Sequence, residues 1–366
     1  MLVNGIAYRT IREQDGKLMI IDQNRLPFEF VITDLNSFDE ALEAIRTMKV
    51  RGAPLIGATA AYAMALASRR LTNEPHFDER MADYGDKLIS VRPTAVNLAW
   101  AVRRVLDEMK NLESNEAKIN SAWETARNIA EEDAEYCRNI GNHGADLLSG
   151  IKPRSGKTLN ILTHCNAGWL ATIDYGTATA PIYEAFKRGL DIHVWVDETR
   201  PRNQGSRLTA WELYHQGIKH TIIADNTGGH LMQNGMVDIV IVGSDRTTAC
   251  GDVCNKTGTY LKALAAADNN VPFYAALPVS TIDFALNQGV GVIPIELRSA
   301  DEIRYTDVFL DGKLQKGLCV NPGSEAANYA FDVTPARLIT GLITERGICK
   351  ADRQSIAELY PEKEGQ

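Results

Sequence analysis

Hydrophobic and polar residues follow two different periods along the 366-residue chain, and the period changes near residue 155. Before that point the apolar residues recur at helical spacing, as in SFDEALEAIRTMKV, RGAPLIGATAAYAMALASRR and TAVNLAWAVRRVLDEMK. After it, short apolar runs alternate with helical stretches. The pattern predicts a mostly helical N-terminal domain over residues 1–150 and an α/β domain over residues 155–366, joined by the polar stretch IKPRSGK.

The N-terminal domain begins with short alternating segments rather than with a helix. In YRTIREQDGKLMIIDQ, the pair Asp15-Gly16 separates two strand-like runs, which indicates a β-hairpin. Ser37 followed by Glu40 predicts a capping box at the start of the first helix.

Six β-rich runs define the C-terminal domain: LNILTHC, IHVWVDE, KHTIIAD, DIVIVGSD, PFYAALP and VIPIEL. Helical stretches lie between them, which is typical of a largely parallel sheet covered by helices. Ligands of such sheets bind beyond the carboxyl ends of the strands. Those ends carry Cys165, Asp197, Asp225 and Asp245. The chain has neither GxGxxG nor GxxxxGK[ST], so neither common nucleotide-phosphate motif is indicated.

Composition narrows the function classes. A formal charge of −8 and a pI near 5.5 argue against a nucleic-acid or anionic-membrane surface. No apolar run approaches the roughly 20 residues of a membrane span, and the start lacks the features of a signal peptide, so we expect a cytoplasmic protein. Its six cysteines are then reduced. Cys250 and Cys254 have no zinc-ligand spacing, and we expect them in a turn and an early helix, with no metal.

Several longer motifs stand in a characteristic order: RGAPLIG, THCNAG, ETRPRNQGSRLTAWEL, GSDRTTACGDVCNKTGTY, LPVSTID and FDVTP. In these the chain resembles, over nearly its whole length, the family of aldose 1-phosphate isomerases that also includes the regulatory subunits of translation factor eIF2B. The resemblance implies a Rossmann-like C-terminal domain, a homodimer, conversion of an aldose 1-phosphate to its ketose, and no cofactor or metal.

The resemblance places the two catalytic positions at Cys165 and Asp245. Isomerisation moves a hydrogen from C2 to C1, and opening the ring of a sugar 1-phosphate needs an acid at the ring oxygen. We expect Asp245 to transfer protons at oxygen, and Cys165 to act at carbon or to stabilise the transition state. Whether a proton or a hydride moves between the carbons stays open. His164 alternates with Cys165 along the strand, so we expect it to face away and to be structural.

Phosphate binding needs cations and accessible backbone N–H groups. Arg51 offers a two-pronged donor, Gly52 and Ala53 allow close approach of the backbone, and Pro54 suits the first helical turn. The resemblance adds Arg92, Gln204, Asn255 and Lys256 as substrate or phosphate contacts. We also expect Asp225 and the turn Thr227-Gly228-Gly229 to border the pocket.

The chain departs from the usual family pattern DRIAxNGDVANKIGTY at Thr247, Cys250, Cys254 and Thr257. These changes leave the catalytic and phosphate positions intact and leave open the group carried at C5 of the sugar. The alternatives are a methylthio group, the methyl of a 5-deoxy sugar and a second phosphate. The second phosphate would need additional cations, and the sequence shows no added basic cluster to supply them. A non-catalytic eIF2B-like subunit is the alternative of a different class, which is not expected to keep both Cys165 and Asp245.

Overall fold

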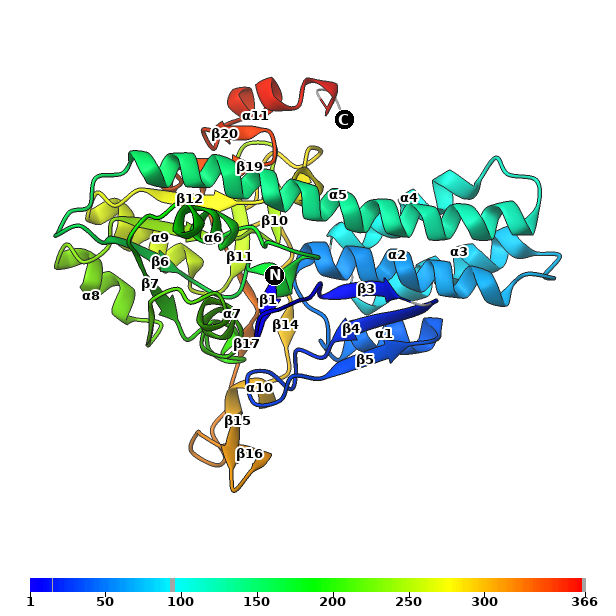
Figure 1. The fold of residues 1–366 in the computed structure, drawn as a ribbon, viewed down its shortest axis with the longest axis horizontal. Helices are drawn as coiled ribbons and strands as arrows, with labels where there is room; N and C mark the ends of the chain where they lie inside the picture. The colour runs from blue at the N-terminus through cyan, green and yellow to red at the C-terminus, as the bar shows by residue number, and fades with distance from the viewer. Residues whose placement is uncertain (15, 93–95, 364–366) are drawn as a thin grey trace.

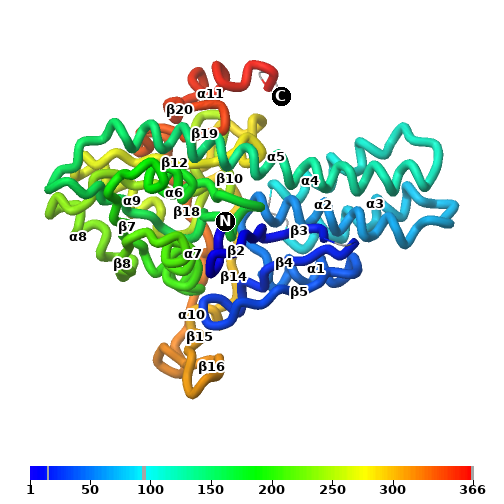
Figure 2. Tube along the Cα trace, viewed as in Figure 1, coloured from blue at the N-terminus to red at the C-terminus, as the bar shows by residue number. Residues whose placement is uncertain are grey.

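A computed structural model describes residues 1–14, 16–92 and 96–363 of the chain (Figure 1). A helical region and a sheet region lie side by side, and one long helix, α5 (Asn115–Gly150), runs along both. The predicted α/β class, with a helical N-terminal part and a large parallel-rich sheet, is confirmed. The N-terminus lies near the boundary between the two regions (Figure 2), where the Met1 ammonium contacts Asp174 at 2.7 Å.

Helix α2 (Ala53–Arg70) forms the centre of the helical region. It is alanine-rich and buried on every side, as expected of a helix surrounded by others. The neighbours that contact it are α1 (Phe38–Arg46), α3 (Phe77–Val91), α4 (Val96–Met109) and the first half of α5. The small alanine side chains allow these helices to approach closely.

The predicted β-hairpin forms between β3 (Ile11–Gln14) and β4 (Lys17–Ile21), and Asp15 of its turn lies outside the described residues. Strand β5 (Ile32–Leu35) completes a three-stranded sheet, and β1 (Leu2–Val3) pairs with β2 (Ile6–Ala7) before it. Of the two hydrogen bonds of the predicted capping box, one forms. Ser37 accepts from the Glu40 N–H at 3.2 Å, but the Glu40 carboxylate accepts from the N–H of Asn36 instead of Ser37.

The main sheet has seven strands in the order β20-β19-β12-β9-β6-β7-β8, and all but β20 run parallel. Five of the six predicted runs form strands in it: β6 (Leu159–Thr163), β7 (Ile192–Asp197), β8 (His220–Ile223), β9 (Ile239–Val242) and β12 (Phe273–Ala276). The sixth prediction, VIPIEL, is wrong. Only its last residue, Leu297, belongs to a strand, β14 (Leu297–Arg298), which pairs with β17 (Asn328–Tyr329) outside the sheet. The remaining two strands are β19 (Gly341–Thr344) and β20 (Gly347–Cys349).

Helices cover both faces of this sheet, so the central strands are largely apolar and buried, whereas the edge strand β8 is partly exposed. In β9, Ile239 and Ile241 pack into one hydrophobic cluster with α5, α6 (Ala180–Lys187) and α7 (Ala210–His215). Val240 and Val242 pack into another on the opposite face with α8 (Thr227–Gln233), α9 (Thr259–Asp268) and α11 (Arg353–Leu359).

The strand order reverses between β6 and β9. From β6 the chain proceeds outward through β7 and β8, and it then returns to the other side of β6 to form β9 and β12. The connections therefore diverge at the carboxyl ends of β6 and β9, which leaves a crevice there. Cys165 follows β6 and Asp245 follows β9.

A second, four-stranded sheet stands over this crevice in the order β13-β10-β11-β18. Its strands are β13 (Ile282–Asp283), β10 (Arg246–Thr248), β11 (Val253–Lys256) and β18 (Phe331–Thr334). Cys250 lies in the turn between β10 and β11, but Cys254 lies in a strand rather than in the predicted early helix. Beyond it, α10 (Asp301–Arg304) leads to a projecting hairpin of β15 (Tyr305–Leu310) and β16 (Lys313–Leu318), seen in Figure 1.

Helix α5 belongs to both hydrophobic cores. Its residues from Ala122 to Ala134 pack in the core of the helical region, and those from Ile140 to Leu148 pack against the main sheet. The domain boundary at residues 150–155 stays a prediction. Among the described residues, no helix combines the length and the hydropathy needed to cross a bilayer.

Asp133 generates a prediction about stability. It is buried on α5 and accepts a hydrogen bond from the Ile173 N–H at 2.8 Å. Burial, only partly offset by this bond, raises its pKa to about 7. Between the unfolded pKa near 4 and pH 7 the native state binds more protons than the unfolded state, so the Asp133 contribution to stability falls by up to about 1.4 kcal/mol per pH unit as pH rises. Asp133→Asn is expected to remove this decline in urea denaturation measured from pH 4 to 8.

The control is Asp146→Asn, which changes an exposed carboxylate on the same helix. It should leave the pH dependence as in the wild type. An unchanged pH dependence in Asp133→Asn would contradict the buried, proton-holding state of this carboxyl.

Candidate active site

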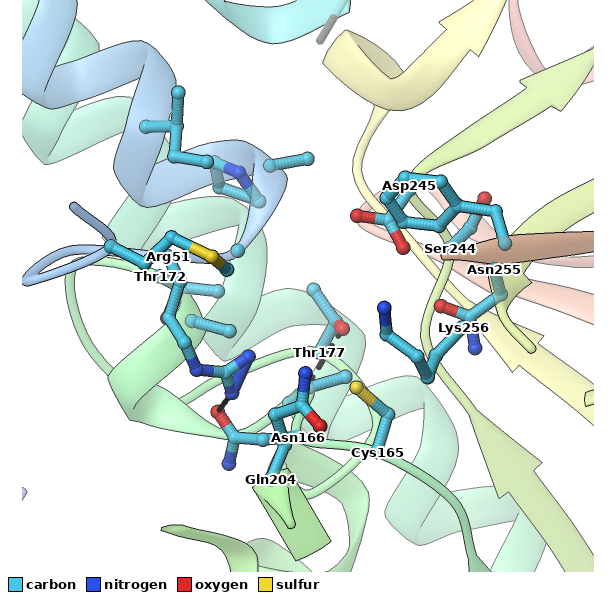
Figure 3. A pocket seen from close by; sticks show the side chains of 18 of the residues that line it. Arg51, Cys165, Asn166, Thr172, Thr177, Gln204, Ser244, Asp245, Asn255 and Lys256 are labelled. Atoms are coloured by element: carbon cyan, nitrogen blue, oxygen red, sulfur yellow. Dashed lines mark hydrogen bonds between the residues drawn. The ribbon is translucent and has the colours of Figure 1, made fainter. Parts of the chain in front are cut away.

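One pocket occupies the crevice between the helical region and the sheets, and it gathers the sequence-predicted residues (Figure 3). Every candidate lines it: Arg51, Gly52, Ala53, Arg92, Cys165, Gln204, Asp245, Asn255 and Lys256. They come from the start of α2, the end of α3, the ends of β6 and β9, the segment before α7, and β11. Residues separated by about 200 positions therefore meet in one place.

The Cys165 thiol is held by a constrained backbone. Cys165 has φ = 67°, a left-handed conformation that is uncommon for a residue with a side chain. Its N–H donates to the Thr199 hydroxyl at 2.9 Å, and its carbonyl accepts from the Thr209 hydroxyl at 2.7 Å. Such strain persists only where surrounding contacts enforce it, and here it directs the side chain into the pocket.

Asp225 supports this arrangement from behind. Its carboxylate accepts from the N–H groups of Thr199 at 2.7 Å and of Arg200 at 2.8 Å, and Thr199 itself has φ = 65°. The prediction that Asp225 and residues 227–229 border the pocket is wrong, because none of them contributes to the described lining. A carboxylate that follows a strand can contact a ligand or stabilise a turn. Asp225 stabilises the turn at Thr199 and Arg200.

His164 points away from the pocket, as the strand alternation predicts. Its ring nitrogens contact the Asp197 carboxylate at 2.8 Å and the Thr257 carbonyl at 2.9 Å. His164, Asp197 and Asp225 present atoms close enough to hold a metal ion. The Lys262 ammonium already occupies this position, since it lies 2.8 Å from Asp197 and also donates to the Asp225 carbonyl. The charge of Asp197 is therefore paired with a cation of the chain itself, although Oδ1 of Asp197 has no hydrogen-bond partner among the described residues.

The β10–β11 hairpin brings the second catalytic candidate beside two polar side chains. The Asp245 N–H donates to the Cys254 carbonyl at 2.9 Å, which fixes Asp245 against β11. Lys256 follows on that strand and donates to the Ala330 carbonyl at 2.7 Å, while the Asn255 amide donates to Thr259 at 3.1 Å. In Figure 3 the Lys256 ammonium is seen between the Asp245 carboxylate and the Cys165 sulfur.

The surroundings of this group raise the pKa of both reactive side chains. Burial raises the pKa of Asp245, and the positive charges of Lys256, Arg92 and Arg51 only partly oppose the rise. Burial likewise raises the pKa of the Cys165 thiol, against the effect of Arg51 and Lys256. A carboxyl with a raised pKa is suited to donate a proton near neutral pH.

Arg51 is oriented by a chain of buried hydrogen bonds. Its guanidinium donates to the Asn166 side-chain oxygen at 2.8 Å. The Asn166 amide nitrogen donates in turn to Glu212 at 2.9 Å and to Thr209 at 3.2 Å, so the amide oxygen must face Arg51. Glu212 also accepts from Tyr183 at 2.7 Å, which fixes the carboxylate itself.

The pocket holds more buried positive charge than its own carboxylates neutralise. Within the described part of the chain, neither Arg51 nor Lys256 has a carboxylate at ion-pair distance, and burial lowers the pKa of both. Nε of Arg51 and Nε and Nη1 of Arg92 are buried without a hydrogen-bond partner among the described residues. Unpaired buried cations are costly, so the site is built for an anion.

The start of α2 adds backbone donors to these cations. Gly52 caps the helix with φ = 92°, the first turn carries no acidic residue, and Gly52, Ala53 and Pro54 line the pocket. The N-terminus of an 18-residue helix favours an anion through its free N–H groups and its dipole.

Several pocket residues were not selected from the sequence. They are Met48, Ile56, Asn166, Ala167, Ala171, Thr172, Thr177, Arg202, Ser244, Pro278, Arg298 and Phe331. Asn166 had a signal, because it follows Cys165 in the motif THCNAG. Arg202 and Arg298 had none of their own. Both bond Glu302, and Arg298 also bonds Glu296, so their charge is balanced inside the protein.

Comparison with known proteins shows the family of the chain. Residues 49–351 match the model of the Initiation factor 2 subunit family, and the chain therefore belongs to that family. Within it, the chain is 56% identical over 366 residues to a methylthioribose-1-phosphate isomerase of Methylorubrum extorquens, with 99% of both chains covered. It is 55% identical over 367 residues to one of Desulfatibacillum aliphaticivorans, covering 99% of this chain and 100% of that protein.

Solved structures of the same family share the fold. A 5-methylthioribose 1-phosphate isomerase from Pyrococcus horikoshii superposes with a TM-score of 0.82 at 36% identity, covering 97% of this chain and 96% of that one. A structure from A. fulgidus described as translation initiation factor eIF-2B, subunit delta, gives a TM-score of 0.80 at 38% identity, covering 97% and 100%.

Gly52 provides a direct test of the anion site. A Cβ at Gly52 would lie 2.3 Å from the Ala171 carbonyl oxygen, so the start of α2 would have to shift. Gly52→Ala is expected to lower the affinity for inorganic phosphate at least tenfold in calorimetry and to cost about 2–4 kcal/mol of stability, from the left-handed backbone and the clash together.

Gly189→Ala is the matched control. Gly189 has φ = 91°, nearly that of Gly52, but a Cβ there meets nothing within 4 Å. It should cost only about 1 kcal/mol and leave phosphate binding unchanged. Equal phosphate affinities in the two variants would mean that the N-terminus of α2 does not bind the anion.

Proposed function

We propose that the protein is an intramolecular aldose–ketose isomerase that converts 5-methylthioribose 1-phosphate to 5-methylthioribulose 1-phosphate, a step of methionine salvage. The proposal is supported by full-length similarity to proteins named for this activity. The observation that carries it in the structure is the meeting of Cys165, Asp245 and two unpaired buried cations in one pocket.

The geometry suits the substrate's phosphate. The phosphate ester at C1 supplies the anion that Arg51 and the start of α2 lack, and it offers acceptors to Nε and Nη1 of Arg92, which have no partner among the described residues although Arg92 also contacts Glu296. Lys256 lies close enough to Asp245 and Cys165 to influence the pKa of both. Gln204, whose side-chain oxygen has no partner among the described residues, is placed to accept from a sugar hydroxyl. Binding energy at the phosphate then holds C1 and C2 near the thiol and the carboxyl.

The proposed chemistry begins at the ring oxygen. Protonated Asp245 donates to that oxygen as its bond to C1 breaks, and the phosphate remains on C1. A hydrogen then passes from C2 to C1, and the hydroxyl on C2 loses its proton to form the ketone. Asp245, now ionised, accepts that proton. Cys165 acts at carbon in one of two ways. As a thiolate it would take the proton from C2 and return it to C1, whereas as the thiol, the form that burial favours, it would stabilise the transition state of a hydride shift.

The two catalytic roles are tested by Cys165→Ser and Asp245→Asn. Each is expected to lower kcat by at least 100-fold, the lower range for a lost proton-transfer group, while substrate still binds. Product formation is followed by NMR and binding by calorimetry. Cys319→Ser and Asp311→Asn, which change the same residue types at exposed positions outside the pocket, should keep wild-type turnover. Near-normal kcat in either pocket variant would remove that residue from the mechanism.

The pH profile tests the protonation state of Asp245. Since burial raises its pKa and the acid form is the reactive one, kcat/KM should be level at low pH and fall tenfold per unit once pH exceeds that pKa. In Asp245→Asn the residual activity should lack this descending limb. If the fall of kcat/KM at high pH persisted in the variant, the titrating group would be the substrate phosphate or another residue rather than Asp245.

The eIF2B-like alternative is a binding subunit without catalysis. The A. fulgidus neighbour carries such a description. A buried thiol with a strained backbone, in the same pocket as a carboxyl with a raised pKa, has no evident use in a subunit that only binds. We therefore favour the enzyme.

A homodimer and a cytoplasmic location complete the proposal. Both rest on the family resemblance and on the sequence composition, and neither depends on the pocket geometry. Sedimentation equilibrium would measure the first directly.

A further inference from the structure

A buried carboxylate lies one amide group behind Arg51. It belongs to Glu212 of α7, which is 0% exposed. The Asn166 side chain stands between the two charges. Its oxygen accepts from the Arg51 guanidinium at 2.8 Å (Figure 3), and its nitrogen donates to Glu212 at 2.9 Å. A positive and a negative charge, both buried, are thus linked through a neutral side chain.

The donors around Glu212 fit an ionised carboxylate. Oε1 accepts from the Asn166 amide and from the Leu170 N–H, both at 2.9 Å, and Oε2 accepts from the Tyr183 hydroxyl at 2.7 Å. A carboxylate accepts at all of these positions, whereas the acid form would have to place a proton of its own among them. Burial raises the pKa of Glu212, and the three hydrogen bonds together with the charge of Arg51 oppose that rise.

The motif THCNAG makes room for this carboxylate. A Cβ on its last residue, Gly168, would lie 1.6 Å from Oε2 of Glu212, so no larger residue at that position is compatible with the carboxylate. The same motif supplies Asn166. It therefore provides both the amide and the space that Glu212 needs, although 46 positions separate Asn166 from Glu212.

The amide between the charges determines how strongly Arg51 can hold an anion. A carboxylate in direct contact would form a complete ion pair with the guanidinium, and a phosphate would have to compete with it. With no carboxylate nearby, the buried guanidinium would be costly in the free protein and would hold an anion more tightly. One amide group of separation gives an intermediate strength of binding.

We propose that Glu212 is a positioning residue for Arg51 and that its negative charge, acting past the Asn166 amide, keeps the affinity of Arg51 for the ester phosphate below its maximum. This inference rests on the proposed isomerase function, in which Arg51 binds that phosphate. It assigns control of phosphate affinity to a residue that does not contribute to the described pocket lining.

Glu212→Gln removes the charge with little change of shape. The oxygen of the glutamine can accept from Asn166 and Leu170, and its nitrogen can donate to the Tyr183 hydroxyl, which is able to accept as well as donate. Because a nearby negative charge no longer repels the ligand, the Kd for inorganic phosphate is expected to fall about tenfold in calorimetry. The KM for 5-methylthioribose 1-phosphate should fall with it.

The direction of this change separates the proposed role from a purely structural one. If Glu212 only kept Arg51 in place, its replacement would misorient the guanidinium and weaken phosphate binding. Glu345→Gln is the matched control, because Glu345 is also a buried carboxylate that accepts from a tyrosine hydroxyl, at 2.9 Å, and from a backbone N–H, at 3.1 Å. It lies outside the described pocket lining and should leave the phosphate Kd within about twofold of the wild-type value.

Asn166→Asp tests the separation of the charges from the other direction. It places a carboxylate in direct contact with Arg51, so the phosphate Kd is expected to rise by about tenfold or more. Asn166→Leu loses the amide without adding a charge, and the aspartate variant should bind phosphate more weakly than the leucine variant. This pair keeps the inference testable if Glu212→Gln folds poorly.

The outcomes distinguish this inference from the proposed function. Tighter phosphate binding in Glu212→Gln supports the inference. An unchanged or weaker affinity in that variant overturns it, as does an Asn166→Asp variant that binds phosphate at least as tightly as Asn166→Leu. Both of these results leave the isomerase function standing. Wild-type protein that does not convert 5-methylthioribose 1-phosphate would instead overturn the proposed function, whatever the phosphate affinities of the variants.

Discussion

The reversal of strand order between β6 and β9 is the constraint on which the site depends. Two parallel strands that are neighbours in the sheet, but whose following connections diverge, leave a crevice that no other pair of neighbours in such a sheet provides. Cys165 and Asp245 occupy the two edges of that crevice, although 79 positions separate them in the chain. The helical region closes it from the opposite side by directing the start of α2 toward the same space.

The pocket combines a rigid support with incomplete charge balance. Threonine hydroxyls hold both backbone groups of Cys165, and a Glu212–Asn166 pair fixes the direction of Arg51. These supporting contacts are internally satisfied, whereas Nε of Arg51 and Nε and Nη1 of Arg92, in two residues that line the pocket, have no hydrogen-bond partner among the described residues. The arrangement is therefore preorganised for an anion, and the free energy of its binding can position the reacting carbons.

Much of this could be predicted from the sequence, and the failures have physical reasons. The central strands were recognised because burial on both faces makes them largely apolar, and the exposed edge strand β8 was recognised from the run KHTIIAD. VIPIEL satisfies the same pattern, but Val292 and Leu297 are exposed, and Ile293 and Pro294 line a cavity. The proline within the run also cannot donate a ladder hydrogen bond. Asp225 and Asp245 look alike as carboxylates after strands. Only the tertiary contacts distinguish the one that holds the Thr199 turn from the one that faces the pocket. Arg202 could not be found, because its carboxylate partner Glu302 lies 100 positions along the chain. Arg298 pairs with its near neighbours Glu296 and Glu302, and such local pairs do not distinguish a pocket arginine from a surface one.

Helix α5 has a mechanical consequence. It contributes no residue to the described pocket lining, yet it is embedded in the core beneath Arg51 and in the core beneath Cys165. The two parts of the molecule that carry Arg51 and Cys165 thus pack against one continuous helix, and bending that helix would break its own backbone hydrogen bonds. The spacing between the two halves of the site is set at a distance, by a segment that never meets the sugar.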